Sequence, residues 1–348
     1  MTIKLGIIGF GGMGKWHAEN APRAGVEIAA VCDIDSVKQQ EALDRGLKLY
    51  KKAEDLLSDD NVNTVILTVP NHLHKEMAIK AAHAGKNVIS EKPAALTVAE
   101  LDEMERACKD AGVLFTVHQN RRWDRDMLIV KKAFDEGMLG NIFTIESKLH
   151  SGNGYMHEWH LYKKYGGGMM YDWGVHLIDQ ILFMMPEAKI SSLYADIKNV
   201  LHDEVDDYFK IILKLDNGIT AHIELSTYIL EYQPRWLAAG DKGTMVINSF
   251  ACDGAVYRTG ELLKKLPPQI TETVAGPTRQ FAPVPPGGIV TEPLPEVETD
   301  WVDFYRNVND VLDGQADLKV KIPEVRRVLS VMEAAWESSR TGKAVLFE

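Results

Sequence analysis

The chain has 348 residues, enough for two domains with well-buried cores. Its hydrophobic content of 45% and charged content of 26% are those of an ordinary globular protein. The net charge of −11 argues against a nucleic acid or an anionic membrane surface as partner.

The amino terminus and the cysteines predict a cytoplasmic protein. The chain enters a predicted strand at once, without the charged and apolar regions of a signal peptide. No stretch approaches the roughly 20 apolar residues that cross a bilayer. Cys32, Cys108 and Cys252 lie far apart and lack CxxC spacing, so we expect neither a disulfide framework nor a cysteine zinc site.

A glycine-rich turn follows the first predicted strand, residues 4–9, and precedes a predicted helix, residues 15–23. Its sequence fits GxGxxG, in which glycines permit a tight turn and close approach of the backbone to a pyrophosphate. The free N–H groups at the helix N-terminus then face the phosphates. We therefore predict a dinucleotide site that includes Gly9, Phe10, Gly11, Gly12, Met13 and Gly14.

An acidic residue follows the second predicted strand, residues 27–31. Asp33 lies 19 residues after Gly14, where a carboxylate accepts hydrogen bonds from an adenosine ribose and repels a 2′-phosphate. This spacing favours NAD over NADP as the cofactor. Asp35 could share or replace that role, and either residue could simply begin a turn.

Further strands and helices alternate along the first part of the chain, which predicts a parallel, doubly wound sheet. Such sheets bind ligands outside the carboxyl ends of their strands. The predicted strands are 62–69, 87–89 and 113–117, and the predicted helices are 75–84 and 98–111. We assign to cofactor binding the residues at this edge, which are Thr68, Pro70, Asn71, His74, Glu91, Lys92 and Asn120.

Lys92 is the central catalytic candidate. The buried strand 87–89 delivers it to the carboxyl end of the sheet, and Pro93 prevents the strand from continuing. An amine in that position is placed for chemistry. Taken alone, a lysine before a proline is more often a solvated residue at a strand end.

The second part of the chain has a different pattern, which predicts an α+β domain with an open, mostly antiparallel sheet. Segments 142–149, 205–215 and 219–228 alternate in polarity, so one face of their sheet should be covered. Residues 261–300 hold eight of the 14 prolines and are predicted to be an extended loop. We expect a dinucleotide domain at 1–122 and a substrate and oligomerisation domain at 123–348, whose final helices, 301–312 and 323–340, could pack back on the first domain.

A second group of polar residues lies in the predicted helix that follows Gly166-Gly167-Gly168. Asp172 and His176 are four residues apart, so both should lie on one helical face, where the carboxylate could orient the imidazole and stabilise its charge. Two other interpretations stay open. The pair could be structural, or it could bind a metal, although a third ligand is not evident and we assign no metal.

Upstream of these glycines, residues 151–160 form a loop with several rigid polar and aromatic side chains. Hydroxyl groups need directional partners, and the C–H face of a sugar packs on an aromatic ring. We therefore predict that this loop binds a polyhydroxylated substrate, although it could simply cover the sheet. With Lys92, Asp172 and His176, the predicted substrate residues are Asn153, Tyr155, His157 and Trp159.

In this order, GxGxxG, Pro70-Asn71-His72-Leu73-His74, Glu91-Lys92-Pro93 and GGGxxxDxGxH resemble the glucose–fructose oxidoreductase and inositol dehydrogenase (Gfo/Idh/MocA) family. The resemblance covers nearly the whole chain. It implies a Rossmann domain, then an α+β domain whose free sheet face often makes the oligomer, so we expect a homodimer or homotetramer. It also implies that Lys92 and His176 flank the reacting carbinol while Asp172 binds and orients. In this family the Lys-Pro bond is often cis.

The expected activity is hydride transfer between NAD and a secondary hydroxyl of a cyclic polyol, a sugar or C3 of a glycoside. His176 is the expected base, and Lys92 the expected stabiliser of the alkoxide. One departure from the family pattern is His160, which stands where an arginine often follows the tryptophan of the loop. A hydrolase or lyase that retains NAD and a catalytically silent NAD(H)-binding regulator stay open as alternatives.

Overall fold

The first part of the chain forms a parallel sheet in the computed structural model, which describes residues 2–264, 270–279, 284 and 286–347. Its strand order is β3-β2-β1-β4-β5-β6, which confirms the predicted doubly wound sheet. The strands are β1 (Lys4–Ile8), β2 (Glu27–Cys32), β3 (Leu49–Tyr50), β4 (Thr64–Leu67), β5 (Asn87–Ser90) and β6 (Phe115–Val117). The helices are α1 (Gly12–Asn20), α2 (Ser36–Asp44), α3 (Ala53–Leu57), α4 (His74–His83) and α5 (Val98–Asp110).

The first glycine turn is shaped by contacts that leave no room for side chains. Gly9 has φ +97°, and a Cβ there would lie 2.6 Å from the carbonyl oxygen of Thr68. A Cβ on Gly14 would lie 2.2 Å from the carbonyl oxygen of Gly9. Helix α1 begins at Gly12, three residues before the predicted start, because the last glycines of the motif already form its first turn.

The second part of the chain forms a nine-stranded sheet, ordered β16-β13-β12-β11-β7-β10-β9-β8-β17. Strands β7 and β10 pair in parallel and the other neighbours are antiparallel, which confirms the mostly antiparallel prediction. Its strands are β7 (Ile142–His150), β8 (Ile190–Lys198), β9 (Tyr208–Leu215), β10 (Thr220–Ser226), β11 (Trp236–Gly240), β12 (Gly243–Ile247), β13 (Gly254–Thr259), β16 (Ile289–Glu292) and β17 (Val345–Leu346).

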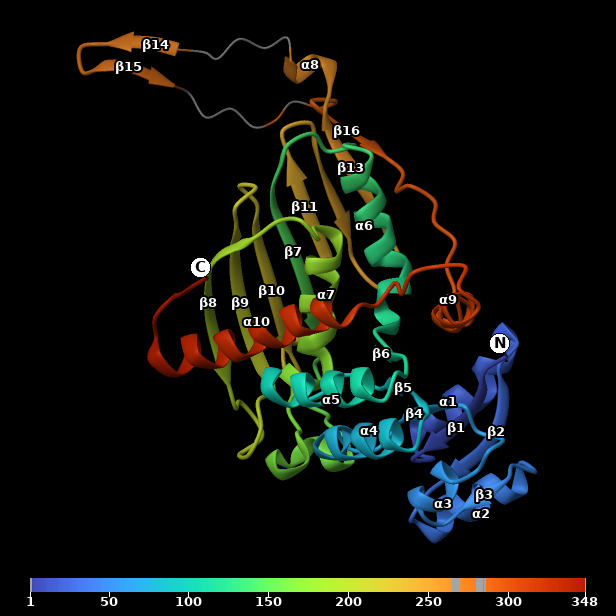
Figure 1. The fold of residues 1–348 in the computed structure, drawn as a ribbon. Coiled ribbons are helices and arrows are strands. Elements are labelled where there is room, and N and C mark those ends of the chain that lie inside the picture. Colours follow the sequence, from blue (N-terminus) through green and yellow to red (C-terminus); the bar gives the residue numbers. More distant parts are fainter. Residues whose placement is uncertain (1, 265–269, 280–283, 285, 348) are drawn as a thin grey trace.

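Helices pack on one face of this sheet, as Figure 1 shows. Helix α10 (Ile322–Thr341) contacts β8 and also α7 (Val175–Met184), while α6 (Arg125–Asp135) contacts β11. Fully buried Ile145, Ile211 and Ile223 project from the strands toward this side. The period-two alternation therefore separates a covered face from an open one.

The prediction that residues 261–300 are an extended loop is wrong in part. The segment contains α8 (Glu261–Lys264), a hairpin of β14 (Ile270–Thr273) and β15 (Gly276–Arg279), and β16, which pairs with β13. Pro286 and Pro293 flank β16 without interrupting it, so the proline count concealed a strand. Residues 265–269, 280–283 and 285 of this prediction lie outside the described residues.

The last two helices also contact the first sheet's half of the chain. Helix α9 (Asp303–Leu312) packs near α1, where the Tyr305 hydroxyl lies 2.7 Å from Nδ1 of His17. Helix α10 contacts α5 and β6. The division into domains at residue 122 stays a prediction.

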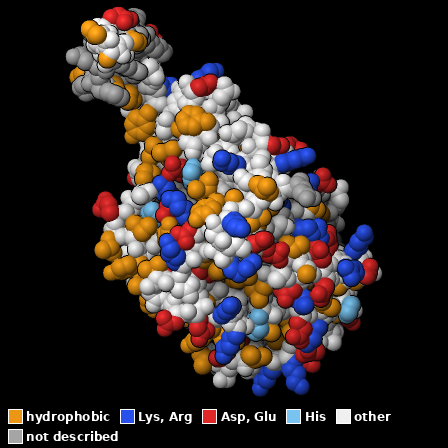
Figure 2. Space-filling view, turned by 90° about the vertical axis from the view of Figure 1, so that its left-hand side faces the viewer, with side chains coloured by type: hydrophobic (Ala, Val, Ile, Leu, Met, Phe, Trp, Pro, Cys, Tyr) orange, Lys and Arg blue, Asp and Glu red, His pale blue; other side chains and the backbone are white. Residues whose placement is uncertain are grey.

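The surface carries both signs of charge. On the face drawn in Figure 2, acidic and basic side chains are interspersed and form no continuous basic patch. Over the described residues, no helix combines the length and the apolarity needed to cross a membrane.

We predict that Gly14→Ala lowers the free energy of unfolding by about 1–3 kcal/mol, because the new Cβ overlaps the Gly9 carbonyl. Gly12→Ala is the matched control. It lies in the same helix, and its Cβ would meet nothing within 4 Å, so its change should stay within about 0.5 kcal/mol. Urea unfolding of the two variants measures both values. Equal stabilities would contradict this explanation of the turn.

Candidate functional site

Lys92 lies where the two sheets approach each other, directly after β5. Its Nζ donates to Oδ1 of Asp172 at 2.7 Å and to the carbonyl oxygen of Asp172 at 2.8 Å. The Lys92-Pro93 peptide bond is cis, as the resemblance implied. His74 flanks this turn, with Nδ1 lying 2.8 Å from the carbonyl oxygen of Pro93. The lysine is therefore bonded across the cavity and is not freely solvated.

Asp172 and His176 line the same cavity, but the described residues show no hydrogen bond between them. Residues Met170–Gly174 form a π-helical turn that carries Asp172 and leads into α7, which carries His176. The Asp172 carboxylate bonds to Lys92 instead. Nδ1 of His176 is buried without a hydrogen-bond partner among the described residues.

A buried carboxylate holds the start of this turn. Oδ2 of Asp206 accepts a hydrogen bond from the Met170 N–H at 2.7 Å, and its backbone carbonyl accepts from Met169 at 2.9 Å. A Cβ on Gly168 would lie 2.1 Å from Oδ1 of Asp206, so a side chain does not fit there. Burial raises the pKa of Asp206 to about 7.

Burial and the charges around Lys92 shift the pKa values of Asp172 and His176. Burial alone would raise the pKa of Asp172, but Lys92 and His160 hold it below its usual value. The pKa of His176 lies well below its usual value because of burial and the nearby charges of Lys92 and Arg121. Near neutral pH the cavity therefore holds a carboxylate paired with an ammonium beside an uncharged imidazole, a set that can accept a proton from a hydroxyl and stabilise the oxygen left behind.

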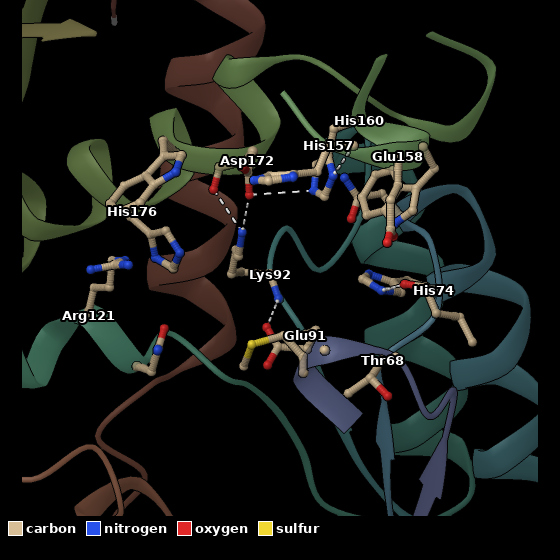
Figure 3. A pocket seen from close by; sticks show the side chains of 18 of the residues that line it. Thr68, His74, Glu91, Lys92, Arg121, His157, Glu158, His160, Asp172 and His176 are labelled. Atoms are coloured by element: carbon tan, nitrogen blue, oxygen red, sulfur yellow. Dashed lines mark hydrogen bonds and ion pairs between the residues drawn. The ribbon is translucent and has the colours of Figure 1, made fainter. Parts of the chain in front are cut away.

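These residues face a cavity of about 420 Å³ at the carboxyl edge of the parallel sheet (Figure 3). It extends from the glycine turn to the helix that carries His176. Thirteen of the predicted site residues line it, namely Gly11, Gly12, Met13, Thr68, Asn71, His74, Glu91, Lys92, Asn120, His157, Trp159, Asp172 and His176. A second cavity of about 590 Å³ shares Arg121 and Trp301 with it.

Seven predicted residues are not among those that line the first cavity, and several have other contacts. Asp33 is held by the N–H groups of Phe10, at 2.6 Å, and Asp35, at 2.8 Å. Asn153 bonds within its own loop, to Ser151 and Tyr155, and Tyr155 is 64% exposed. The seven are Gly9, Phe10, Gly14, Asp33, Pro70, Asn153 and Tyr155.

The geometry also brings in residues that sequence reasoning did not assign to the site. The guanidinium of Arg121 lies 3.9 Å from the ring centroid of Trp173. His160 stacks on Trp159, with ring centroids 3.8 Å apart, and its Nε2 lies 3.7 Å from Oδ1 of Asp172. Arg121 follows Asn120 at a strand end, which was an available signal. Trp301 lies 180 positions further along the chain than Arg121 (301 − 121), and no motif near it in the sequence indicates that it belongs to the site.

The residues at the glycine turn fit a dinucleotide. Cβ atoms built on Gly11 and Gly12 meet nothing within 4 Å, so the turn is open where a pyrophosphate would approach. Gly11 immediately precedes α1 and Gly12 begins it. The first N–H groups of this helix are free to bind phosphate oxygens. Oδ1 of Asp35 caps α2 by accepting the N–H groups of Val37 and Lys38, so this residue begins a helix, as one of its open interpretations held.

Comparison with known proteins agrees with this geometry. Residues 3–119 match the model of an oxidoreductase family with an NAD-binding Rossmann fold, and residues 127–246 match a GFO/IDH/MocA C-terminal domain. The scyllo-inositol 2-dehydrogenase (NADP(+)) IolW of Bacillus subtilis is 30% identical, over 100% of this chain and 96% of that protein. The myo-inositol 2-dehydrogenase of Thermotoga maritima is 28% identical, over 69% of this chain and 74% of that protein.

Among solved structures, an NAD-binding protein from Listeria innocua superposes with a TM-score of 0.92 and 37% identity, over 100% of both chains. The fold and the cavity at its dinucleotide edge are those of an oxidoreductase with a Rossmann domain. The chain belongs to the GFO/IDH/MocA family.

Proposed function

We propose that this protein is an NAD-dependent dehydrogenase that acts on a secondary hydroxyl of a cyclic polyol, a sugar or a glycoside. The observation that carries this proposal is the convergence of the Lys92 ammonium and the unpaired His176 ring on one cavity, at the open glycine turn. The inositol dehydrogenases among the relatives support a polyhydroxylated substrate.

In the proposed mechanism, each residue has one task. His176 is uncharged and buried, so it can accept the hydroxyl proton as general base. Lys92 stabilises the negative charge that develops on the same oxygen. Asp172 fixes the Lys92 ammonium through Oδ1, and its Oδ2 accepts a hydrogen bond from a substrate hydroxyl. The nicotinamide, when bound, supplies the acceptor of the hydride.

The assay that tests the function is NADH formation with a panel of inositols, free sugars and glycosides. Glycosides belong in the panel because the second cavity adjoins the first at Arg121 and Trp301, which leaves space beyond a single ring. An NAD-retaining hydrolase or lyase would release no NADH but would exchange a substrate hydrogen with solvent. A silent regulator would do neither.

With the true substrate, we predict that Lys92→Ala loses kcat by at least 100-fold, about 2.7 kcal/mol, while its Kd for NAD stays nearly normal. Lys75→Ala is the control, because this half-exposed lysine pairs with Glu103 on the surface and should keep full turnover. His176→Ala should also lose activity, but less as pH rises, because hydroxide partly replaces the missing base. Near wild-type turnover in both cavity variants would refute the mechanism.

The cofactor preference depends on Asp33. We expect the Kd for NADP to exceed that for NAD by at least about tenfold, roughly 1.4 kcal/mol, because the carboxylate repels a 2′-phosphate. Asp33→Asn keeps the size of the side chain and an acceptor for the Phe10 N–H, so it should remove most of the preference without breaking the turn. Asp35→Asn should leave the preference intact. NADP binding as tightly as NAD to the wild type would overturn this assignment.

We also propose a homo-oligomer, a dimer or tetramer, that covers the open face of the nine-stranded sheet. A row of side chains crosses that face from strand to strand. Tyr194 is 45% exposed, and the other five side chains of the row are partly exposed. The row consists of Tyr194, Ile212, His222, Glu146, Leu237 and Val246. Mixed apolar and polar groups of this kind suit a closed, symmetric contact between identical sheets.

Light scattering at micromolar concentration should therefore give the mass of a dimer or tetramer. Ile212→Lys should shift the wild-type species toward the monomer, because the new charge lies between Lys210 and Lys214 on the same strand. Leu43→Lys, at an exposed position of α2, should leave the mass unchanged. A monomeric wild type would exclude the proposal.

A further inference from the structure

A buried carboxylate lies directly behind Lys92. Glu91 is 5% exposed, and its Oε1 lies 2.9 Å from Nε2 of His17 and 2.8 Å from Nδ1 of His118. Its Oε2 accepts the backbone N–H of Lys92 at 3.1 Å. Both histidines are fully buried. Three donors from three segments, α1, the end of β5 and the residue after β6, thus converge on one side chain.

The direction of each hydrogen bond follows from the chemistry. An ionised carboxylate only accepts, so Nε2 of His17 and Nδ1 of His118 both carry protons. The remaining nitrogen of a neutral His17 is then an acceptor, and it lies 2.7 Å from the Tyr305 hydroxyl, which donates to it. Nε2 of His118 is buried without a hydrogen-bond partner among the described residues.

Hydrogen bonding within this cluster and metal binding by it exclude each other, because a metal would displace the protons on the two nitrogens. The ligand atoms of His17, Glu91 and His118 lie within 4.8 Å of one another, which is close enough to hold a cation. However, both nitrogens that face Glu91 carry protons, so neither has a lone pair to offer. Burial alone would raise the pKa of Glu91, but the contacts with His118 and His17 hold it well below its usual range, so the carboxylate stays ionised.

The cluster of Glu91, His17 and His118 contacts Lys92 through the backbone N–H of Lys92. The ammonium is already fixed at its tip by Asp172, and the N–H of the same residue is fixed by Glu91. The side chain between these two points spans from the core of the first sheet to the wall of the cavity. A carboxylate that moved would release the peptide from which Lys92 projects.

We propose that Glu91, clamped by His17 and His118, is a positioning residue that holds Lys92 in the cavity, and that Tyr305 couples this clamp to helix α9. The proposal rests on the dehydrogenase function above only for its kinetic readout. The role of Glu91 is then to fix the lysine and not to bind the cofactor, although part of the side chain also lines the cavity.

A matched pair of variants at His118 tests the clamp. Asn places an amide N–H near the position of Nδ1 and can still donate to Glu91, whereas Leu fills a similar volume and cannot. In hydrogen–deuterium exchange of the full chain, His118→Leu should speed exchange of peptides that span residues 88–96 by about tenfold or more, and His118→Asn should stay close to wild type. This readout needs no substrate, so it decides the proposal even if the proposed activity is absent.

In turnover assays, His118→Leu should lower kcat by about tenfold or more, with KM and the Kd for NAD within about threefold, and His118→Asn should recover most of the loss. If His118→Leu does not fold, Glu91→Gln, which preserves volume, should give the same faster exchange and the same loss of kcat. Unchanged exchange, or equal losses in the Leu and Asn variants, would refute the clamp. One equivalent of zinc in the purified protein would also refute it and make the cluster a metal site.

Discussion

The ion pair between Lys92 and Asp172 joins the part of the chain that forms the parallel sheet to the part that forms the nine-stranded sheet. Lys92 follows a strand of the parallel sheet, and Asp172 lies in the π-helical turn that leads into α7, which packs on the second sheet. Their side chains are 18% and 22% exposed, and a pair with that access to water contributes little to stability. Its importance is geometric. The ammonium is aimed into the cavity only when both parts of the chain are folded and docked.

Stronger constraints elsewhere hold that docking in place. Arg122, which follows the parallel sheet, is nearly inaccessible and donates to both oxygens of Asp179 on α7 and to Glu324 on α10. Burial would lower the pKa of this guanidinium, but its carboxylate partners raise it. Removing one partner of such a buried pair leaves an uncompensated charge, which is far more unfavourable than losing a surface pair. The site is therefore positioned by groups that do not reach it.

Sequence reasoning succeeded where the signal was local and failed where it was not. The glycine turn and Lys92 follow from short motifs at strand ends, so both were placed correctly. The predicted hydrogen bond between Asp172 and His176 considered only residues on one helix, whereas the Asp172 carboxylate bonds to Lys92, 80 positions earlier in the chain. Strand β16 was hidden because prolines at its ends dominated the composition. His17, His118 and Tyr305 are separated by up to 288 positions, and no spacing rule connects them to Glu91.

The bond between Asp172 and Lys92 also bears on the charges in the cavity. Had the Asp172 carboxylate bonded to His176, it would have favoured the imidazolium, which cannot accept a proton. Asp172 bonds to Lys92 instead, and burial together with the charge of Lys92 disfavours a charge on the His176 ring. One carboxylate thus supports both halves of the proposed chemistry. It holds the cation proposed to stabilise an alkoxide, and the charge of that cation adds to the larger effect of burial in keeping the pKa of the His176 base low.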